Sequence, residues 1–361
     1  MGLKSWATTN NTVWTTSNGT IVTSLVDDDN PQGIRPYTVR FKFDDTTYNP
    51  TNESWASGSF WVQVTSEPNV WDFTYVATGW ASAFRNRFQD RNNLVHVLGA
   101  NLVGVTSIGS AFYNCIALRS VASMDLSTVT AMSDSFNGCT ALNSVTELHT
   151  AAITYIGGMF GNCTSLTTVP LFDTSKVTNM STMFSGCTSL TSVPLFDTSK
   201  VTDMLSMFYG CTSLTNVPLF DTSKVLDMTS MFRSCAALTT VPLFDTSNVT
   251  SMHGMFDSCS ALANAPLLNT SKVIDMQSMF SNCRSLTAVP LYNTVNATNV
   301  ESMFAYCKNV SSGALALYQQ MSSQVVVPET HTSCFRNCGS DTVTGSAELA
   351  QIPRSWGGTM S

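Results

Sequence analysis

The chain has 361 residues, a formal net charge of −7 and only 11% charged residues, against about 25% in typical soluble domains. No basic patch accompanies this acidic balance, so nucleic acid is excluded as an expected partner. No apolar run approaches the roughly 18 residues of a membrane-spanning helix, and the length predicts two or three domains.

Residues 1–78 are rich in Thr, Asn and Trp and predict a small β-rich domain. Alternating apolar residues indicate strands over Tyr37–Phe43 and Ser57–Val64, with a loop between them. The first residues, beginning MGLKSWATTNN, lack the apolar core of a secretory signal. We therefore expect a chain that folds in a reducing cytoplasm, where cysteines stay unpaired.

Residues 79–100 predict a helical cap at the N-terminal end of the array that follows. The expected helix lies near Trp80–Phe88, because its apolar residues recur at helical spacing. Four side chains would share one face and cover the first coil: Trp80, Ala83, Phe84 and Phe88.

Residues 101–310 repeat a 24-residue unit in strict phase. Nine cysteines define the register: Cys115, Cys139, Cys163, Cys187, Cys211, Cys235, Cys259, Cys283 and Cys307. A phenylalanine stands three residues before each: Phe112, Phe136, Phe160, Phe184, Phe208, Phe232, Phe256, Phe280 and Phe304. A fixed period of this length is the signature of a solenoid, in which neighbouring copies close one another's core.

Each copy predicts one short helix and one short extended segment. In the copy that starts at Leu171, apolar residues from Val177 to Cys187 recur at helical spacing. The following LTSVPL segment, from Leu190 to Leu195, indicates a strand with apolar Leu190, Val193 and Leu195, and its proline limits the length. The predicted fold class is an α/β repeat: a leucine-rich-repeat-like β/α solenoid of about nine coils.

The repeat VTxMxxMFxxCxSLTxVPLFDTSK resembles the BspA-like leucine-rich repeats in surface proteins of gut and oral bacteria and of the phages that infect them. The resemblance covers about residues 101–310. The first two copies differ, because Ala111 and Ser135 replace the methionine before phenylalanine and the VPL triplet is missing. The resemblance implies adhesion and supplies no catalytic residue.

We interpret the cysteine ladder as a row of buried side chains that pack against one another in successive coils. Stacked copies place like beside like, and free cysteine behaves as a small buried hydrophobe. Bridges between neighbours are not expected, because the Cβ vectors of stacked residues run parallel. No recurring CxxC pair or in-phase histidine indicates a metal site, so no cofactor is predicted.

A second ladder consists of acidic residues: Asp125, Asp173, Asp197, Asp221 and Asp245, continued by Asn269 and Asn293. One hypothesis is a row of calcium sites. The other is that each carboxylate caps a turn, with a lysine three residues later to offset the stacked charge. One carboxylate per copy is few for calcium, which needs 6 to 8 oxygens.

A ligand surface would use positions that vary between copies while the core stays fixed. Five such residues form the candidate ligand face: Tyr209, Arg233, His253, Asp257 and Gln277. The alternative is neutral variation on a solvated face.

After the array, residues 311–361 predict a C-terminal cap. A helix is expected over Ala314–Ser322. The SCFRNCGS segment repeats the FxxC spacing at Phe335 and Cys338 and predicts a last partial coil. Cys334 and Cys338 are expected to be free thiols, with a disulfide or half of a metal site as the alternatives.

The leading functional hypothesis is a non-enzymatic virion structural protein of a phage: a capsid decoration, head fibre or tail fibre. Its N-terminal region would bind other virion proteins, and its solenoid a glycan or protein of the host surface or mucus. Multiple copies or a homo-oligomer are expected. The alternative is a bacterial cell-surface adhesin whose export signal is missing. A third class, a glycan-cleaving enzyme, would need carboxylates such as Glu53, Asp72 and Asp90, whose spacing does not support it.

Overall fold

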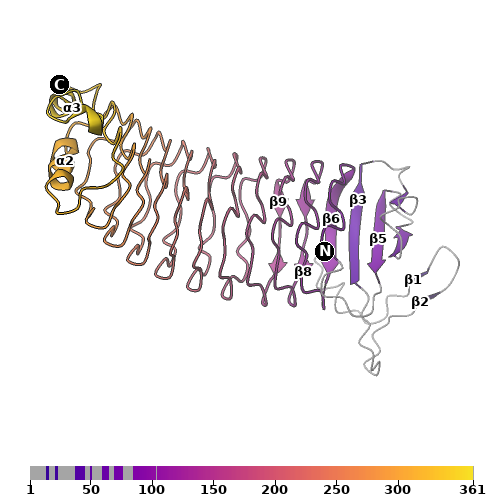
Figure 1. Cartoon of the computed structure of the whole chain (residues 1–361). Coiled ribbons are helices and arrows are strands. Elements are labelled where there is room, and N and C mark those ends of the chain that lie inside the picture. Colours follow the sequence, from indigo (N-terminus) through magenta and orange to yellow (C-terminus); the bar gives the residue numbers. More distant parts are fainter. Residues whose placement is uncertain are drawn as a thin grey trace.

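The computed structural model describes residues 14–15, 21–22, 37–44, 49–50, 59–64, 69–75, 84–102 and 104–360. These residues form an elongated rod (Figure 1). A sheet lies at its N-terminal end, stacked coils make up its length, and two short helices lie at its C-terminal end. The chain therefore folds as a repeat solenoid, as its period predicts.

The N-terminal end is an antiparallel arrangement of longer strands. The strands are β3 (Tyr37–Phe43), β4 (Ser59–Gln63), β5 (Val70–Tyr75) and β6 (Leu94–Asn101), beside a separate antiparallel pair of β1 (Trp14–Thr15) and β2 (Ile21–Val22). In the sheet, β3 lies between β6 and β5, and β4 pairs with β5. The sequence predicts β3 and β4, the latter within slightly wider bounds; it gives no prediction of β5.

Strand β6 joins this sheet to the repeats. Its first half pairs in parallel with β7 (Ser120–Val121), and its second half with β8 (Met124–Asp125). The next copy continues both lines with β9 (Ser144–Val145) and β10 (Leu148–His149). Because β3 runs antiparallel to β6, the parallel stacking of coils stops at β3.

The helical cap predicted for residues 79–100 is wrong in its described part. Phe84 and Phe88 lie in turns that precede β6, while Trp80 and Ala83 lie outside the described residues. Phe88 occupies the phenylalanine position of a coil, since its ring stacks on Phe112 at 5.4 Å and its amide donates to the carbonyl of Ala111. Its other side packs edge-on against Phe41 at 4.7 Å. Strand β3, and not a helix, therefore covers the end of the array at Phe88. The register of the repeat extends back to Phe88.

The helices predicted inside the repeats are also wrong. Residues Ser181–Gly186 and their equivalents form consecutive turns, with Thr182 (φ 53) and Gly186 (φ 76) left-handed. The amides of Thr182 and Phe184 donate to the next coil, at 2.8 and 2.9 Å, and not to their own turn. An α-helix would need right-handed residues throughout and internal bonds for these amides. We call this side of the solenoid the turn face.

The VPL segments contain no strand. In the copy around Pro194, the amide of Phe196 folds back to the carbonyl of Pro194 at 3.0 Å. This tight turn reverses the side-chain alternation, so Phe196 is buried and Leu195 is 59% exposed. The short strand predicted over Leu190 to Leu195 is therefore wrong; within this segment Leu190 and Val193 are buried, whereas Leu195 points outward.

The core is one continuous stack along the rod. From Phe112 to Phe304 the rings of successive coils are nearly parallel, with centroids 5.2 to 5.9 Å apart. In the central copies a second aromatic row packs beside it, as in the contact of Phe208 with Phe220 at 6.3 Å. Stacking of identical aromatic rings thus fixes the coil-to-coil step.

The C-terminal end follows the prediction closely. Helix α2 spans Ala314–Ser322, and the partial coil stacks Phe335 on Phe304 at 6.3 Å. Helix α3 (Val343–Leu349) and the 3₁₀ turn η3 (Arg354–Trp356) complete the cap and are not predicted. Glu348 ties the two helices together by accepting the amides of Gly313 and Leu315.

Candidate functional site

The nine ladder cysteines lie in the interior and have a hydrogen-bonding role that packing alone does not predict. Each thiol donates to the carbonyl of the phenylalanine in the preceding coil, over 2.9 to 3.1 Å, from Cys115 with Phe88 to Cys307 with Phe280. That carbonyl also accepts the amide of its own coil's cysteine, as in Cys163 with Phe160 at 3.2 Å. Both lone pairs of a buried carbonyl are thus engaged.

These thiols are chemically quiet. Burial raises the pKa of Cys115, Cys187 and Cys307 to about 12, and that of the other ladder cysteines well above its usual value. The thiolate is the form that attacks substrates and binds metals, so the ladder is neutral at physiological pH. Cys334 and Cys338 are likewise buried and unpaired, with burial raising the pKa of each.

The aspartate ladder caps turns at the surface. Each Oδ1 accepts the amide two residues further on, as Asp125 does from Ser127 and Asp173 from Ser175, at 3.0 and 2.9 Å. The remaining members make the same contact: Asp197, Asp221 and Asp245, followed by Asn269 and Asn293. Hydrogen bonds from the serine two residues further on lower the pKa of Asp173, Asp197, Asp221 and Asp245, so these four carboxylates are ionised at neutral pH.

Below this row, buried threonines link the coils. The hydroxyl of Thr174 donates to the carbonyl of Asp197 at 2.9 Å, and the same bond recurs in the neighbouring copies. Lysines complete the edge: Lys176 donates to the carbonyl of Ala151 at 2.9 Å. In the part of the chain that the structure describes, no group of three or more His, Cys, Asp or Glu side chains is placed to hold a metal ion.

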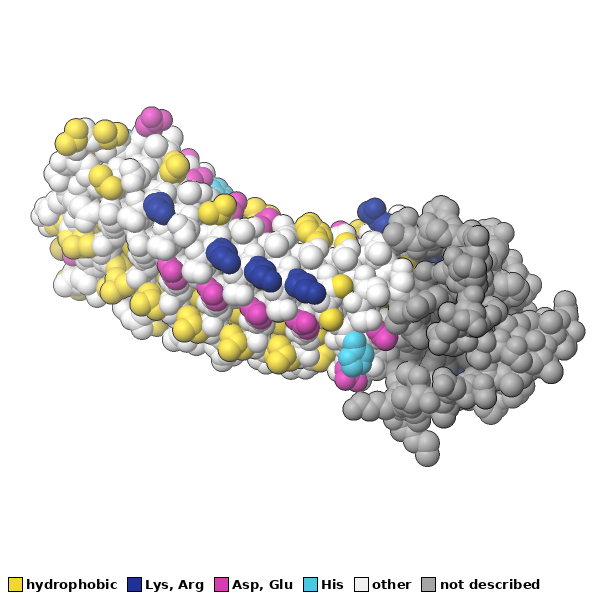
Figure 2. Space-filling model, turned by 90° about the horizontal axis from the view of Figure 1, so that it is seen from below, with side chains coloured by type: hydrophobic (Ala, Val, Ile, Leu, Met, Phe, Trp, Pro, Cys, Tyr) yellow, Lys and Arg dark blue, Asp and Glu magenta, His cyan; other side chains and the backbone are white. Residues whose placement is uncertain are grey.

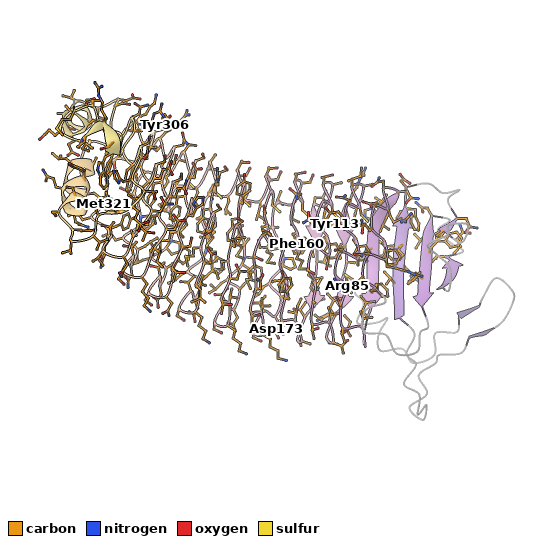
Figure 3. All side chains as sticks on the ribbon, viewed as in Figure 1. Arg85, Tyr113, Phe160, Asp173, Tyr306 and Met321 are labelled. Carbon is orange, nitrogen blue, oxygen red and sulfur yellow. The ribbon has the colours of Figure 1, made fainter. Side chains whose placement is uncertain are left out.

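A row of exposed leucines runs beside the aspartates. Its members are 59% to 70% exposed: Leu171, Leu195, Leu219, Leu243, Leu267 and Leu291. Figure 2 shows three parallel rows along the rod, leucines in yellow, aspartates in magenta and lysines in dark blue. We call these rows together the leucine strip. Phe160 lies inside the rod, whereas Asp173 stands at its lower edge (Figure 3).

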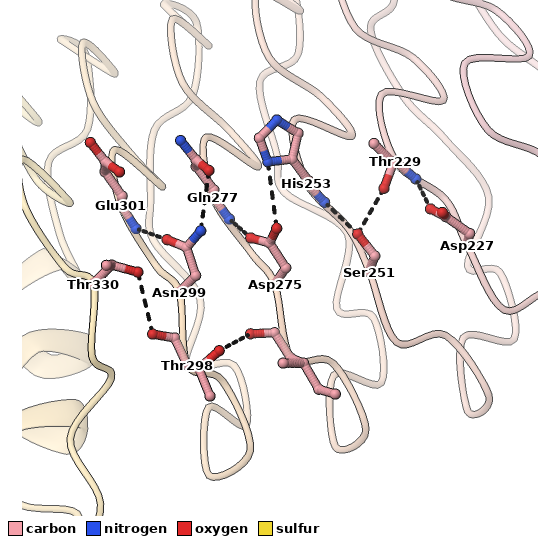
Figure 4. A network of polar contacts seen from close by, with 11 residues as sticks. Asp227, Thr229, Ser251, His253, Asp275, Gln277, Thr298, Asn299, Glu301 and Thr330 are labelled. Atoms are coloured by element: carbon pink, nitrogen blue, oxygen red, sulfur yellow. Dashed lines mark hydrogen bonds and ion pairs between the residues drawn. The ribbon is translucent and has the colours of Figure 1, made fainter.

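The candidate ligand face lies on the opposite part of the coil, on the turn face, where most of its members contact residues of neighbouring coils along the rod. Arg233 Nε pairs with Asp257 Oδ2 at 3.2 Å, and Asp257 is buried. His253 Nδ1 lies 3.6 Å from Asp275 Oδ2 (Figure 4). Tyr209 is 41% exposed and is the most accessible of the five.

A polar network of neighbouring coils surrounds these residues. Gln277 Oε1 accepts from Asn299 Nδ2 at 3.1 Å, and Thr229 bonds Ser251 at 2.7 Å (Figure 4). Sequence reasoning missed Asp275 and Asn299. Their signal was available, because an Asp, Asn or Ser stands eight residues before each cysteine in these copies and caps the first turn, as Asp275 does for the amide of Gln277.

Of the three carboxylates considered for glycan cleavage, two lie among the described residues, on different elements of the fold. Asp72 is buried and forms a two-pronged ion pair with Arg40, at 2.6 and 2.8 Å. Asp90 lies in the turn before β6, where its Oδ2 accepts from Gln89. Glu53 lies outside the described residues.

Comparisons with known proteins give a matching family and a similar solved structure. The family described as "Mycoplasma protein of unknown function, DUF285" matches residues 82–192, 106–219, 159–261 and 213–316. Among curated proteins, none matches the sequence. A solved leucine-rich repeat protein from Eubacterium ventriosum shares 15% identity, with a TM-score of 0.35, over 85% of this chain and 99% of its own.

The matched segments overlap and together run from residue 82 to 316. Their start precedes Phe88, whose ring stacks on Phe112 in the register of the repeat. Within the described residues, no helix is long and apolar enough to cross a membrane.

Proposed function

The chain belongs to the DUF285 family, and from that premise we propose that it is a non-enzymatic adhesive repeat protein. The observation that carries the proposal is the leucine row, six apolar side chains left 59% to 70% exposed in one line. Contiguous apolar surface on a soluble protein marks an interaction site. The resemblance of the repeat to those of bacterial surface proteins supports the same role.

The leucine strip offers a partner two kinds of contact. The leucines supply apolar area, and the adjacent aspartate and lysine rows supply charge and hydrogen bonds. Each coil repeats the same set, so a glycan or protein on a host surface or in mucus would meet many weak contacts at once. Multiple linked contacts raise the overall affinity far above that of each alone.

The test removes two leucines from the strip. The double variant Leu195→Ser/Leu219→Ser is compared with Ile116→Ser/Val343→Ser, which changes two exposed apolar residues elsewhere. Binding is measured on plates coated with mucin and on plates coated with bacterial envelopes. Burying one leucine contributes on the order of 1–2 kcal/mol, so we expect the strip variant to bind at least about tenfold more weakly.

Two outcomes would contradict the adhesive role of the strip. One is equal binding by the strip variant and the control variant, and the other is no binding of the wild type to either surface. Stability should change by less than about 0.5 kcal/mol in both variants, because all four side chains are exposed. A denaturation curve checks this, so lost folding cannot be mistaken for lost binding.

A finer proposal concerns where the chain is carried. We propose a phage virion, as a capsid decoration, head fibre or tail fibre attached through the N-terminal region in several copies; the support is the repeat resemblance alone. Mass spectrometry of density-purified phage particles tests it. Many copies per particle are expected, whereas recovery from bacterial cell surfaces alone would leave the alternative, a bacterial adhesin.

A further inference from the structure

A line of polar side chains crosses the outer face of the sheet at the N-terminal end of the solenoid. The strand register places Lys42 of β3 beside His96 of β6, and His96 beside Ser120 of β7. Their chain neighbours Phe41, Phe43, Val97 and Val121 are buried. Because side chains alternate across a strand, Lys42, His96 and Ser120 share the face that points away from the core.

The histidine is held in place by a hydrogen bond. His96 Nδ1 lies 2.7 Å from Ser120 Oγ. This contact fixes the ring and makes Nε2 the nitrogen through which the imidazole can meet a ligand. The next strand in the row, β9, contributes Ser144 in register with Ser120, which adds a second hydroxyl to the line.

Positive charge converges on this row from separate elements. The pKa of His96 is lowered by burial first, and then by the charges of Lys42 and of Arg119, which immediately precedes β7. Lys42 and Arg119 thus place two positive charges near His96, on a chain whose net charge is −7.

We propose that Lys42, His96, Arg119 and Ser120 form a binding site for a tetrahedral oxyanion, phosphate or sulfate, free or as a monoester on a larger molecule. Arginine and lysine supply the charge, with arginine able to bind two oxygens at once. The Nε2–H of a protonated His96 and the serine hydroxyls supply directional hydrogen bonds. The site lies outside the leucine strip and does not depend on the adhesive role.

Protonation of His96 and binding of the anion are coupled. An anion favours the imidazolium, so binding raises the pKa of His96, whereas burial, Lys42 on β3 and Arg119 before β7 lower it in the free protein. The neighbouring strand β9 adds only the uncharged Ser144 at this row. Affinity for the anion therefore rises as the pH falls through the pKa of the bound form.

The experiment follows the ring protons of the four histidines by NMR across a pH titration, in chloride and in inorganic phosphate at matched ionic strength. We expect phosphate to raise the pKa of His96 by roughly 1 and to leave His149, His253 and His331 unchanged. No change at His96, or an equal change at all four histidines, would overturn the proposal.

A matched pair of variants tests the role of arginine. Arg119→Gln removes the proposed ligand, and Arg284→Gln removes another exposed arginine, far along the rod. Half-saturation of the His96 shift should need at least about fivefold more phosphate in Arg119→Gln than in Arg284→Gln; equal values would overturn the assignment. Both variants should have the wild-type thermal midpoint in chloride, since both side chains are exposed.

A third set of probes distinguishes a site for the free anion from a site for a monoester on a larger molecule. Inorganic phosphate and sulfate are compared with glucose 6-sulfate, with glucose as the neutral control. A response to all three anions indicates a site open to esters on a larger partner, and a response to the inorganic ions alone indicates a site for the free anion. A response to glucose of the same size would overturn the proposal, because charge would then not be what is recognised.

Discussion

Two stretches of the same solenoid, residues 118–149 and 166–292, join their coils differently. In the first, the amides of Ala122 and Thr146 donate to the carbonyls of Val97 and Val121, at 2.8 and 3.0 Å, and short parallel strands form. In the second, the same repeat position is proline from Pro170 to Pro290. Proline has no amide hydrogen, so this ladder cannot continue.

The turn face does not distinguish the two stretches. Phe136 donates its amide to the carbonyl of Met159 at 2.9 Å in the first, and Phe208 donates its amide to the carbonyl of Met231 at 2.9 Å in the second. The coils are therefore linked on the turn face throughout. On the opposite side, the proline copies keep other bonds between coils, such as that from the amide of Thr191 to the carbonyl of Thr167 at 3.0 Å. They lack the bond made at the positions of Ala122 and Thr146, and there the chain exposes its leucines.

The largest effect tests whether both stretches share one core. Phe136→Ala and Phe208→Ala should each cost about 3–5 kcal/mol of unfolding free energy, because each ring lies between two stacked rings. Denaturant unfolding measures both. A much smaller cost for Phe136 would mean that the first stretch is not part of the same stack.

An intermediate effect tests the role of proline. Thr146→Pro removes the hydrogen bond to Val121 at an exposed position of the first stretch and should cost about 1–3 kcal/mol. The reverse change in the second stretch, Pro194→Thr, breaks no such bond and should alter stability by less than about 0.5 kcal/mol. Equal costs in denaturant unfolding would show that proline does not cause the difference.

The smallest effect concerns the aspartate row. Asp221→Asn should leave stability nearly unchanged at pH 7, since Asn269 caps the same turn in a later copy. Hydrogen bonds from Ser223 lower the pKa of Asp221, so its contribution is present above the usual carboxyl pKa of about 4. It is lost as the pH falls through the lowered pKa.

The small stability advantage of the wild type over Asp221→Asn should therefore shrink in acid. Thermal midpoints between pH 7 and pH 2 measure it. A gap that widens in acid would mean that the carboxylate is strained in the fold and not stabilised by it.

Much of the architecture can be predicted from the sequence, because the same pattern recurs in successive copies and a position that is ambiguous in one copy is clear in the others. The Phe and Cys ladders and helix α2 lie where their spacing predicts. The repeat helices failed for a physical reason: residues such as Met180, Phe184 and Cys187 would line one side of a helix, and they also line one side of consecutive turns. The distinguishing signal is a pair of small or left-handed-tolerant residues four positions apart in most copies, such as Ser206 and Gly210.

The candidate site was harder to predict. Leu195 is apolar and alternates with Val193, so a strand pattern assigns it to the core. Its exposure depends on the turn from Pro194 to Phe196, which is a tertiary outcome of losing the ladder. The row of Lys42, His96 and Ser120 joins residues far apart in the sequence, and only the register of β3, β6 and β7 brings them together.

The hydrogen bonds that join repeat coils reach the copy immediately before or after, whether from Thr174 to Asp197 or from Cys187 to Phe160. The contacts at the two ends of the rod therefore do not depend on the number of copies between them. In-frame duplication or deletion of one repeat's coding stretch would therefore lengthen or shorten the rod by one step and leave both caps intact. The reach of the protein can be adjusted by recombination alone, without new compensating substitutions.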